Sequence, residues 1–437
     1  LHSEIDMNLI RRFTLRTVLV LPVLLAGCAK VERPNVLLIS LDTLRADHLS
    51  SYGYERETTP FMDEVAGQGV RFHWAFVNTL ATTNSHTTIL SSQYQESHGV
   101  MFGGKSSSES NRLPENLPLV QESFRDAGYK TLAVTDGGNF AVRHGFDRGF
   151  DEFHGKVVRG VEEGTQLFLD MLDSNLPTDE PLFLLYHTYE IHAPYDPPPP
   201  YDTQFSTGAE STFVPTARNL RKVQDTASRD LTADDFAHMV SLYDGGIRFT
   251  DDKLREMFRG LEERGFFDGD YLVVITSDHG EEFGDHGGVL HRGLLYDELI
   301  RVPLIMRGAR LPDGEVRQDI ISSVDISPTM LAYAGISIPE SMQGQDLFSQ
   351  RRRPPHGELI FAQLRTRRYA LRTKEWKFIE SGAVELYDLV ADPGETTNVA
   401  VDHLDKVQEF QNLIERWRKG QEGRRLQAGS VELSSDE

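Results

Sequence analysis

The fold is decided near the start of the chain, where an apolar run ends in a carboxylate: Asn35-Val36-Leu37-Leu38-Ile39-Ser40-Leu41-Asp42. A continuous apolar run is typical of a strand that is buried on both faces of a parallel sheet. A polar residue directly after such a strand lies at the carboxyl edge of the sheet, where open α/β sheets bind ligands. The stretch therefore predicts a buried parallel strand with a functional aspartate at its end.

Similar apolar runs follow along the chain and alternate with helical patterns. They cover residues 131–135, 182–187, 271–277 and 302–306. In the longest helical pattern, apolar residues recur at three- and four-residue steps from Phe236 to Leu261, which gives one buried face. Strands that alternate with helices predict an α/β sandwich with a mostly parallel central sheet.

The pattern of long apolar runs and helices ends after about Gly344. Residues 351–355 read as a linker, and short strand-like segments at 359–362, 369–372, 376–380 and 385–387 precede one helix at 402–417. We predict a catalytic domain over residues 34–348 and a small C-terminal subdomain, an antiparallel sheet plus a helix, over 356–420. The polar loop at 103–111 and the polar tail at 421–437, which begins near Gly420, are predicted to be flexible or disordered.

The charge of the chain limits its partners. Its 67 acidic residues outnumber 45 basic ones, giving a formal net charge of −22. Such a surface repels nucleic acid, so we expect no nucleic-acid partner. A small anionic ester remains a possible substrate if a metal ion or a local group of cations offsets the field.

The N-terminal residues predict export. A basic start that includes Arg11, Arg12 and Arg16 precedes an apolar stretch at 17–27, which is too short to span a bilayer comfortably. It ends in Leu25-Ala26-Gly27-Cys28, which resembles the lipobox of bacterial lipoproteins. A plain anchor helix is the alternative, but Cys28 is the one cysteine of the chain and stands where a lipobox needs it. We expect a signal peptide over 1–28, lipidation of Cys28, a cell-envelope location with membrane attachment by lipid alone, and no intrachain disulfide.

Two strand ends carry candidate metal ligands. Asp42 follows the first strand, and Asp278-His279 follow the strand at 271–277. Strand ends at one edge of a parallel sheet converge, and two carboxylates with an imidazole suit a divalent metal. The histidine favours manganese, zinc or iron over calcium. A lone aspartate is usually a turn or helix-capping residue, so the pairing of two strand ends is what favours a metal site.

A hydroxyl-rich segment lies between these strands: Ala81-Thr82-Thr83-Asn84-Ser85-His86-Thr87-Thr88. If it opens a helix, one hydroxyl lies beside backbone N–H groups and the positive end of the helix dipole, which suits an anion. Clusters of serine and threonine also begin many helices that have no chemical role.

Longer motifs resemble the sulfatases of the alkaline phosphatase superfamily. The stretch at 35–47 looks like their opening, and the resemblance continues in the same order through Thr276-Ser277-Asp278-His279-Gly280-Glu281, Tyr296-Asp297-Glu298-Leu299-Ile300-Arg301-Val302-Pro303, Val324-Asp325-Ile326-Ser327-Pro328-Thr329 and Asp392-Pro393-Gly394-Glu395. It covers roughly residues 34 to 400. The resemblance implies an alkaline-phosphatase-like fold and metal-dependent hydrolysis of sulfuric or phosphoric esters.

The resemblance also implies roles for single residues. The metal ligands would be Asp42, Thr82, Asp278 and His279, with one divalent ion: manganese, zinc, iron or calcium. Thr82 stands where these enzymes carry the cysteine that becomes formylglycine. The remaining substrate contacts would be Ser85, which matches a serine of the family motif, His86, which replaces its arginine, and His291.

Other family positions are matched or altered. His192 matches a histidine that contacts the transferred group or the leaving oxygen, and Arg292 stands at the position of an active-site lysine. A further lysine and histidine of the family correspond to Asp136 and Gly138, and a second strand-end aspartate corresponds to Thr43.

These departures favour a particular chemistry. A threonine cannot become formylglycine, so we expect none, and Thr82 would act as an alkoxide nucleophile. That favours phosphorus esters and leaves sulfate esters open. Two alternatives remain: a transferase that moves a phospho-alcohol head group onto envelope lipid or glycan, and a catalytically dead binding lipoprotein. The intact metal set argues against the dead protein.

Overall fold

The computed structural model describes residues 33–101, 109–155, 160–208, 211–225, 230–291, 293–349, 360–364, 368–427 and 429–432. All of them belong to the larger of two units of the chain, Arg33–Glu437. The predicted signal peptide with Cys28, the linker at 351–355 and Arg292 lie outside the described residues.

An eight-stranded sheet forms the centre of this unit, in the order β11-β2-β10-β7-β1-β6-β4-β5. Its strands are β1 (Asn35–Leu41), β2 (Val70–Phe76), β4 (Lys130–Val134), β5 (Glu152–His154), β6 (Leu182–Thr188), β7 (Tyr271–Thr276), β10 (Arg301–Gly308) and β11 (Glu315–Ser322). Every neighbouring pair is parallel except those of β10, which runs antiparallel to both β2 and β7. The mostly parallel sheet predicted from the apolar runs is confirmed.

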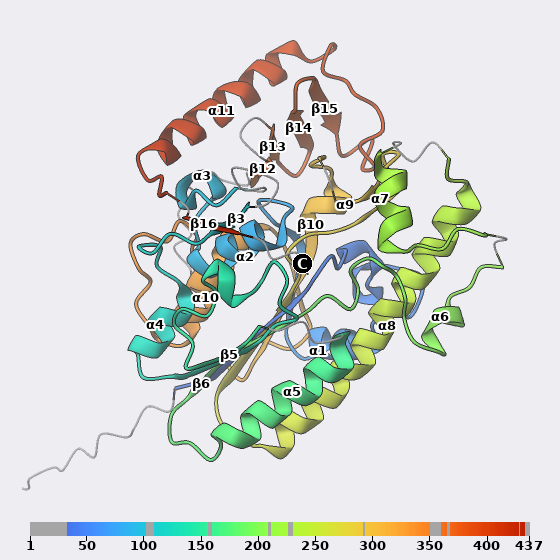
Figure 1. Ribbon diagram of the computed structural model, residues 1–437. Helices are drawn as coiled ribbons and strands as arrows, with labels where there is room; N and C mark the ends of the chain where they lie inside the picture. Colours follow the sequence, from blue (N-terminus) through green and yellow to red (C-terminus); the bar gives the residue numbers. More distant parts are fainter. Residues whose placement is uncertain are drawn as a thin grey trace, which may run out of the picture. The chain divides into compact units, whose positions relative to one another are not determined.

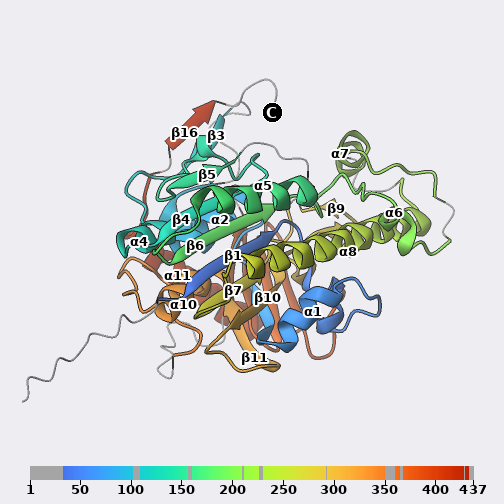
Figure 2. The same ribbon diagram turned by 90° about the horizontal axis from the view of Figure 1, so that it is seen from below.

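Helices cover both faces of the sheet, because successive side chains of each strand point to opposite faces. Leu37 and Ile39 pack with α1 (Pro60–Gly67), α5 (Gly160–Asn175) and α8 (Ala233–Glu263). Val36 and Leu38 pack with α2 (Thr82–Ser91), α4 (Val120–Asp126) and α10 (Ile326–Tyr333). Figures 1 and 2 both show α5 lying beside α8. The helix predicted from Phe236 to Leu261 is confirmed, because this range lies within α8. Helix α8 begins after a capping box at Thr232.

Shorter elements connect these layers. The short helices are α3 (Gln95–His98), α6 (Tyr201–Gln204), α7 (Ala217–Asp225) and α9 (Asp297–Ile300), with 3-10 turns at Ala46–His48, Ser50–Tyr52, Val142–His144 and Ser323–Asp325. A two-residue strand pair, β8 (Glu282–Phe283) with β9 (Val289–Leu290), closes the loop after β7. No helix in the described part of the chain is long and apolar enough to cross a membrane.

The C-terminal sheet is antiparallel and has four strands, β12 (Ile360–Leu364), β13 (Arg368–Arg372), β14 (Trp376–Glu380) and β15 (Val384–Asp388). Helix α11 (Leu404–Glu422) packs on it through Phe410, Ile414 and Trp417; both appear at the top of Figure 1. The predicted small sheet and helix are confirmed, while the domain boundaries at 348 and 356 stay predictions.

Two segments differ from the sequence prediction. Glu109–Arg112, in the predicted flexible loop, forms β3, and Gly429–Glu432, in the predicted disordered tail, forms β16; the two pair antiparallel. The prediction was wrong there because the pairing is made by backbone hydrogen bonds between distant segments, and polar side chains carry no local signal of it.

Candidate active site

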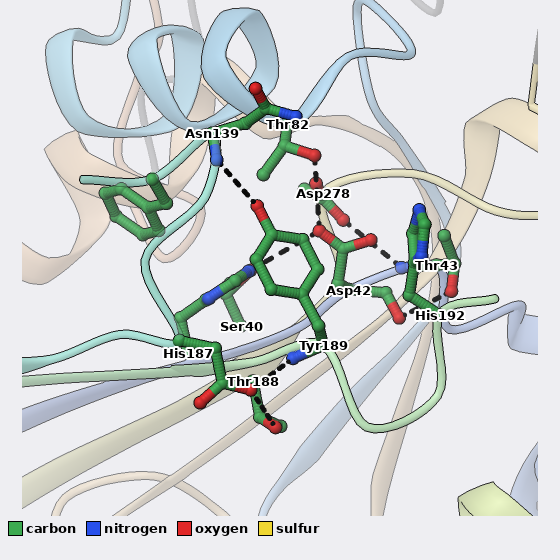
Figure 3. A network of polar contacts seen from close by, with 12 residues as sticks. Ser40, Asp42, Thr43, Thr82, Asn139, His187, Thr188, Tyr189, His192 and Asp278 are labelled. Carbon is green, nitrogen blue, oxygen red and sulfur yellow. Dashed lines mark hydrogen bonds and ion pairs between the residues drawn. The ribbon is translucent and has the colours of Figure 1, made fainter. Parts of the chain in front are cut away.

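The carboxyl ends of β1 and β7 bring three predicted metal ligands together. The two strands are adjacent and parallel, so Asp42 and Asp278 meet at one edge of the sheet (Figure 3). Ligand atoms of Asp42, Asp278 and His279 all lie within 4.8 Å of one another, and all three side chains are buried.

Three atoms of this cluster have no hydrogen-bond partner among the described residues, although His279 Nε2 lies 3.4 Å from Asp278 Oδ2. Asp42 Oδ1, Asp278 Oδ2 and His279 Nε2 are buried and make no hydrogen bond. His279 Nδ1 lies 3.0 Å from the carbonyl oxygen of Gly280 and donates to it, so in the neutral ring Nε2 carries the lone pair. Buried charged oxygens without partners are costly. Two carboxylate oxygens and an imidazole nitrogen facing one another fit a divalent cation.

The electrostatics of the carboxylate pair agree with this assignment. Burial and the nearby Asp42 charge raise the pKa of Asp278 to about 7. Burial alone would also raise the pKa of Asp42, but the hydrogen bond from His187 and the charges of His192 and His279 hold it below its ordinary value. The two carboxylates therefore repel each other, and a cation between them would relieve that repulsion.

Thr82 begins α2 and faces the carboxylates. Its hydroxyl Oγ1 donates to Asp42 Oδ2 at 3.3 Å, and its side chain is almost fully buried. The preceding Ala81 is extended and the helix starts at Thr82 itself, so the free N–H groups of the first turn lie beside this hydroxyl.

Ser85 and His86 lie behind Thr82. Ser85 Oγ donates to the Asp278 carbonyl oxygen at 2.6 Å. His86 Nδ1 donates to the Thr82 carbonyl oxygen at 2.8 Å, and Nε2 lies 2.9 Å from Ser40 Oγ, from which it accepts. Burial and the nearby His187 hold the pKa of His86 well below its usual value. Both ring nitrogens of His86 thus bond to the protein, and these two residues fix the start of α2 against β1 and β7.

Thr43 adopts a backbone conformation that a β-branched residue rarely takes. Its φ is 59°, in the left-handed region. Tyr243 donates from its hydroxyl to the Thr43 carbonyl oxygen at 2.7 Å, and the Thr43 N–H donates to Asp278 Oδ1 at 3.3 Å. Such strain is held at functional sites by surrounding contacts, and here it aims a backbone donor at the carboxylate pair.

Two residues at the end of β6 were missed by the sequence reasoning. His187 is buried beside Ser40 of β1, with Nε2 3.4 Å from Asp42 Oδ2, and its Nδ1 has no partner within the described residues. The Tyr189 hydroxyl accepts a hydrogen bond from the Asn139 N–H at 3.2 Å, on the Thr82 side of the site (Figure 3). The strand-end rule that selected Asp42 would also have selected His187, because the 182–187 run ends there.

Asp136 and Gly138, the positions at which the sequence resemblance predicts the loss of a lysine and a histidine, contact the turn after β6. Asp136 Oδ2 accepts from Thr188 Oγ1 and from the Tyr189 N–H, both at 2.8 Å. A Cβ on Gly138 would come within 3.3 Å of the Tyr189 hydroxyl. Together these positions hold the turn that carries Tyr189.

His192 and His291 complete the side of the site next to His279. The ring centroids of His192 and His291 are 5.2 Å apart, and those of His291 and His279 are 4.3 Å apart. His192 Nδ1 donates to the Ala193 carbonyl oxygen at 2.6 Å, and His291 Nδ1 lies 2.9 Å from Glu281 Oε1. The Nε2 atom of His192 is therefore the one that can exchange a proton with a substrate.

The sequence matches two family models and is similar to known sulfatases. The family model described as "Sulfatase" matches residues 34–336, and the model "N-sulphoglucosamine sulphohydrolase, C-terminal" matches residues 284–421. An arylsulfatase from Clostridium perfringens is 25% identical, with 89% of this chain and 93% of that protein covered.

Solved structures share the fold. A phosphonate monoester hydrolase from Silicibacter pomeroyi has a TM-score of 0.71 at 20% identity, covering 89% of this chain and 96% of that one. A protein solved with its substrate D-glucosamine-2-N,6-O-disulfate has a TM-score of 0.69 at 19% identity, covering 90% of this chain and 99% of that one.

Proposed function

Since the chain belongs to the sulfatase family, it is a hydrolase of sulfuric or phosphoric esters, and we propose that unmodified Thr82 is its nucleophile. The observation that carries the proposal is the placement of the Thr82 hydroxyl at the start of α2, hydrogen-bonded to a buried carboxylate whose second oxygen has no partner among the described residues. The ion would be held by Asp42, Asp278, His279 and the Thr82 oxygen. Bound there, it would supply positive charge that stabilises the charge developing on the transferred group.

We propose that the reaction has two steps. First, Thr82 Oγ1 gives its proton to solvent and bonds to phosphorus, while the bond from phosphorus to the leaving oxygen breaks. His192 Nε2 gives that leaving oxygen a proton. In the second step water attacks phosphorus and gives a proton to His192, and the Thr82 oxygen leaves and takes a proton from solvent.

The unmodified hydroxyl favours phosphorus esters. The hydrate of formylglycine has a second hydroxyl through which sulfate is released by elimination, and threonine has none. The covalent intermediate on Thr82 must therefore be opened by water at the transferred group. We expect phosphate or phosphonate esters to react faster than aryl sulfates, with Arg292 and His291 as further contacts to the anion.

A substrate panel tests this function. An aryl sulfate, a phosphate monoester, a phosphate diester and a phosphonate are assayed with and without manganese, zinc and calcium. Thr82→Ala is expected to lose several orders of magnitude in kcat, Thr82→Ser to keep much of it, and Ser85→Ala to lose about ten- to a hundredfold. Near-normal turnover by Thr82→Ala would remove the mechanism. Strong, Thr82-dependent sulfatase activity would keep the nucleophile and overturn the substrate preference.

The proposal extends to location. The lipobox-like Leu25-Ala26-Gly27-Cys28 supports export and lipidation of Cys28. The protein is then expected to partition into detergent, and Cys28→Ser is expected to release it or leave the signal peptide uncleaved. An unchanged membrane fraction for Cys28→Ser would indicate an anchor helix instead.

A further inference from the structure

The ring of Tyr189, directly after β6, lies beside both the proposed nucleophile and the proposed proton donor. Its centroid is 5.6 Å from that of His192 and 4.7 Å from that of His187, and both pairs meet edge to face. Its hydroxyl points to the Thr82 side of the site (Figure 3), close enough to interact with the Thr82 side chain. An ester that bonds to Thr82 and takes a proton from His192 therefore lies next to Tyr189.

The Tyr189 hydroxyl has a proton to offer such a ligand. A phenolic hydroxyl both accepts and donates hydrogen bonds, and tyrosine keeps its proton at neutral pH. The hydroxyl oxygen accepts from the Asn139 N–H at 3.2 Å, and no carbonyl or carboxylate oxygen of the described residues lies at hydrogen-bond distance to take its proton. Because the oxygen already accepts from the chain, its remaining function toward an ester is to donate.

The loop after β4 holds this hydroxyl in place. Asp136 Oδ2 accepts from the Tyr189 N–H at 2.8 Å and so fixes the backbone. Gly138, whose φ is 56°, leaves the space for the ring, since a Cβ there would lie 3.2 Å from Cε2 and 3.3 Å from the hydroxyl oxygen of Tyr189. Asn139 donates its N–H to the hydroxyl, and its carbonyl oxygen accepts from Thr83 Oγ1 at 2.8 Å. The same loop therefore fixes the position of the hydroxyl relative to α2.

The neighbours of the hydroxyl on this loop are uncharged. Asn139 contributes a backbone N–H, and the ring of Phe140 stacks on that of His86 with centroids 4.1 Å apart. Arg143 is the basic residue of the loop, and its guanidinium donates from Nη2 to the Gly138 carbonyl oxygen at 2.7 Å and from Nε to a ring nitrogen of the next residue at 3.1 Å. The loop thus uses its arginine for its own backbone and presents neutral groups beside Thr82.

The metal set adds little net charge on this side. Asp42 and Asp278 carry two negative charges, which a divalent ion would cancel. Their ion-pair partners in the described part of the chain are the histidines His86, His187 and His279. Each negative charge that a buried ligand brings must be offset, so an anion with one charge suits these surroundings better than an anion with two.

We propose that the Tyr189 hydroxyl donates a hydrogen bond to an oxygen of the transferred group, and that this uncharged donor selects esters whose transferred group carries one negative charge. The inference rests on the proposed function, because Thr82 and His192 define where the ester lies. It adds Tyr189 to the catalytic residues and ranks the substrates. Phosphate diesters and phosphonate monoesters, with one charge, precede phosphate monoesters, whose second pKa of about 6 gives them two charges above neutral pH.

Two esters with the same leaving group test the proposal in the metal-loaded full chain at pH 8. Bis(4-nitrophenyl) phosphate carries one charge and 4-nitrophenyl phosphate carries two. Tyr189→Phe keeps the ring and removes the donor, and it is expected to lower kcat/KM for the diester about ten- to a hundredfold with metal content unchanged. Tyr189→Lys replaces the neutral donor by a cation and is expected to shift the ratio of the two kcat/KM values toward the monoester.

Tyr333→Phe is the matched control. The Tyr333 hydroxyl lies 2.9 Å from Asp270 Oδ1 and from the Tyr271 carbonyl oxygen, at the start of β7 and so at the end of that strand opposite to Asp278. Its kcat/KM values are expected to equal those of the parent. Unchanged kcat/KM in Tyr189→Phe, an equal loss in Tyr333→Phe, or an unchanged diester-to-monoester ratio in Tyr189→Lys overturns the proposal.

Binding to Thr82→Ala separates this proposal from the choice of nucleophile. Isothermal titration uses dimethyl phosphate, with one charge, and methyl phosphate, with two. Dimethyl phosphate is expected to bind more tightly, and adding Tyr189→Phe is expected to weaken its binding about tenfold. Equal affinities for the two anions, or no effect of Tyr189→Phe, overturns the proposal. Failure of Thr82 as nucleophile would appear instead as turnover retained by Thr82→Ala.

Discussion

Two clusters of buried charges in this protein differ in how they are neutralised. In the cluster around Lys377, the ammonium lies 2.7 Å from Asp297 Oδ1 and 3.2 Å from Glu395 Oε1, and Arg372 lies 3.2 Å from Asp297 Oδ2. In the cluster at the ends of β1 and β7, two carboxylates face each other with no lysine or arginine side chain hydrogen-bonded to them among the described residues.

The two clusters differ in how far the chain balances their charges. The charges around Lys377 are balanced by the chain and join β14 to α9. Around Asp42 and Asp278 the described ion pairs are to histidines alone, which fits the proposed metal site. Buried ionic groups are thus informative about function only once their partners have been counted.

Removing a ligand from the unbalanced cluster should have the largest effect. Asp42→Ala and Asp278→Ala are each expected to abolish metal binding and turnover while leaving the fold largely intact, because each removes a charged group that repels its neighbour in the metal-free protein. Metal content by inductively coupled plasma mass spectrometry and the circular dichroism spectrum measure this. Asp173→Ala, which changes an exposed carboxylate that pairs with Arg264, is the control. Stoichiometric metal in both site variants would show that the ion binds elsewhere.

Breaking the balanced cluster should affect stability instead. Lys377→Met leaves Glu395 buried without its cation and Asp297 with Arg372 alone, which is expected to cost about 3–5 kcal/mol of unfolding free energy. Denaturant unfolding measures the loss, and metal content per folded molecule should not change. Lys419→Met, which removes an exposed pair with Glu415, should leave the unfolding free energy almost unchanged. A loss of metal in folded Lys377→Met would contradict the division between the clusters.

The smallest expected effect is a pH dependence of stability. It concerns His286, in the loop that lies between the two clusters. His286 Nδ1 lies 2.7 Å from Glu298 Oε1, and Nε2 donates to the Glu395 carbonyl oxygen at 3.1 Å. Although burial opposes the charge, these partners raise the pKa of His286 from 6.5 to about 9. The stabilisation is therefore complete below about pH 6.5 and lost as the pH rises through 9. Thermal unfolding should show His286→Gln less stable than the parent at pH 6 and nearly equal to it above pH 9. A stability difference independent of pH would contradict this.

Much of the sheet could be predicted from the sequence, because the strands buried on both faces are continuous apolar runs. Strand β11, Glu315–Ser322, was missed because charged residues alternate along this edge of the sheet. The apolar run at 302–306 correctly predicted a strand. It could not predict that this strand, β10, runs antiparallel to its neighbours, because an apolar run has the same pattern in either direction.

The candidate site was predicted in part, because some of its residues directly follow strands that are apolar runs. Asp42, Asp278 and His279 come together because they follow adjacent strands; the strand-end rule selects these residues, and the sheet order supplies the adjacency of β1 and β7. The cluster around Lys377 could not be predicted, since Asp297, Lys377 and Glu395 meet through tertiary packing that no local pattern records.

The position of β1 in the sheet has a consequence for how the protein folds. This strand, Asn35–Leu41, lies between β6 and β7, which follow it in the chain by well over a hundred residues. Closing such large loops costs chain entropy before any contact repays it, and topologies of this kind fold slowly. The two carboxylates of the candidate site, Asp42 and Asp278, meet only once β7 has been added beside β1. A chain stopped before Tyr271 would keep Thr82 and Asp42 yet lack Asp278 and His279, so the candidate site forms only after β7 has been made.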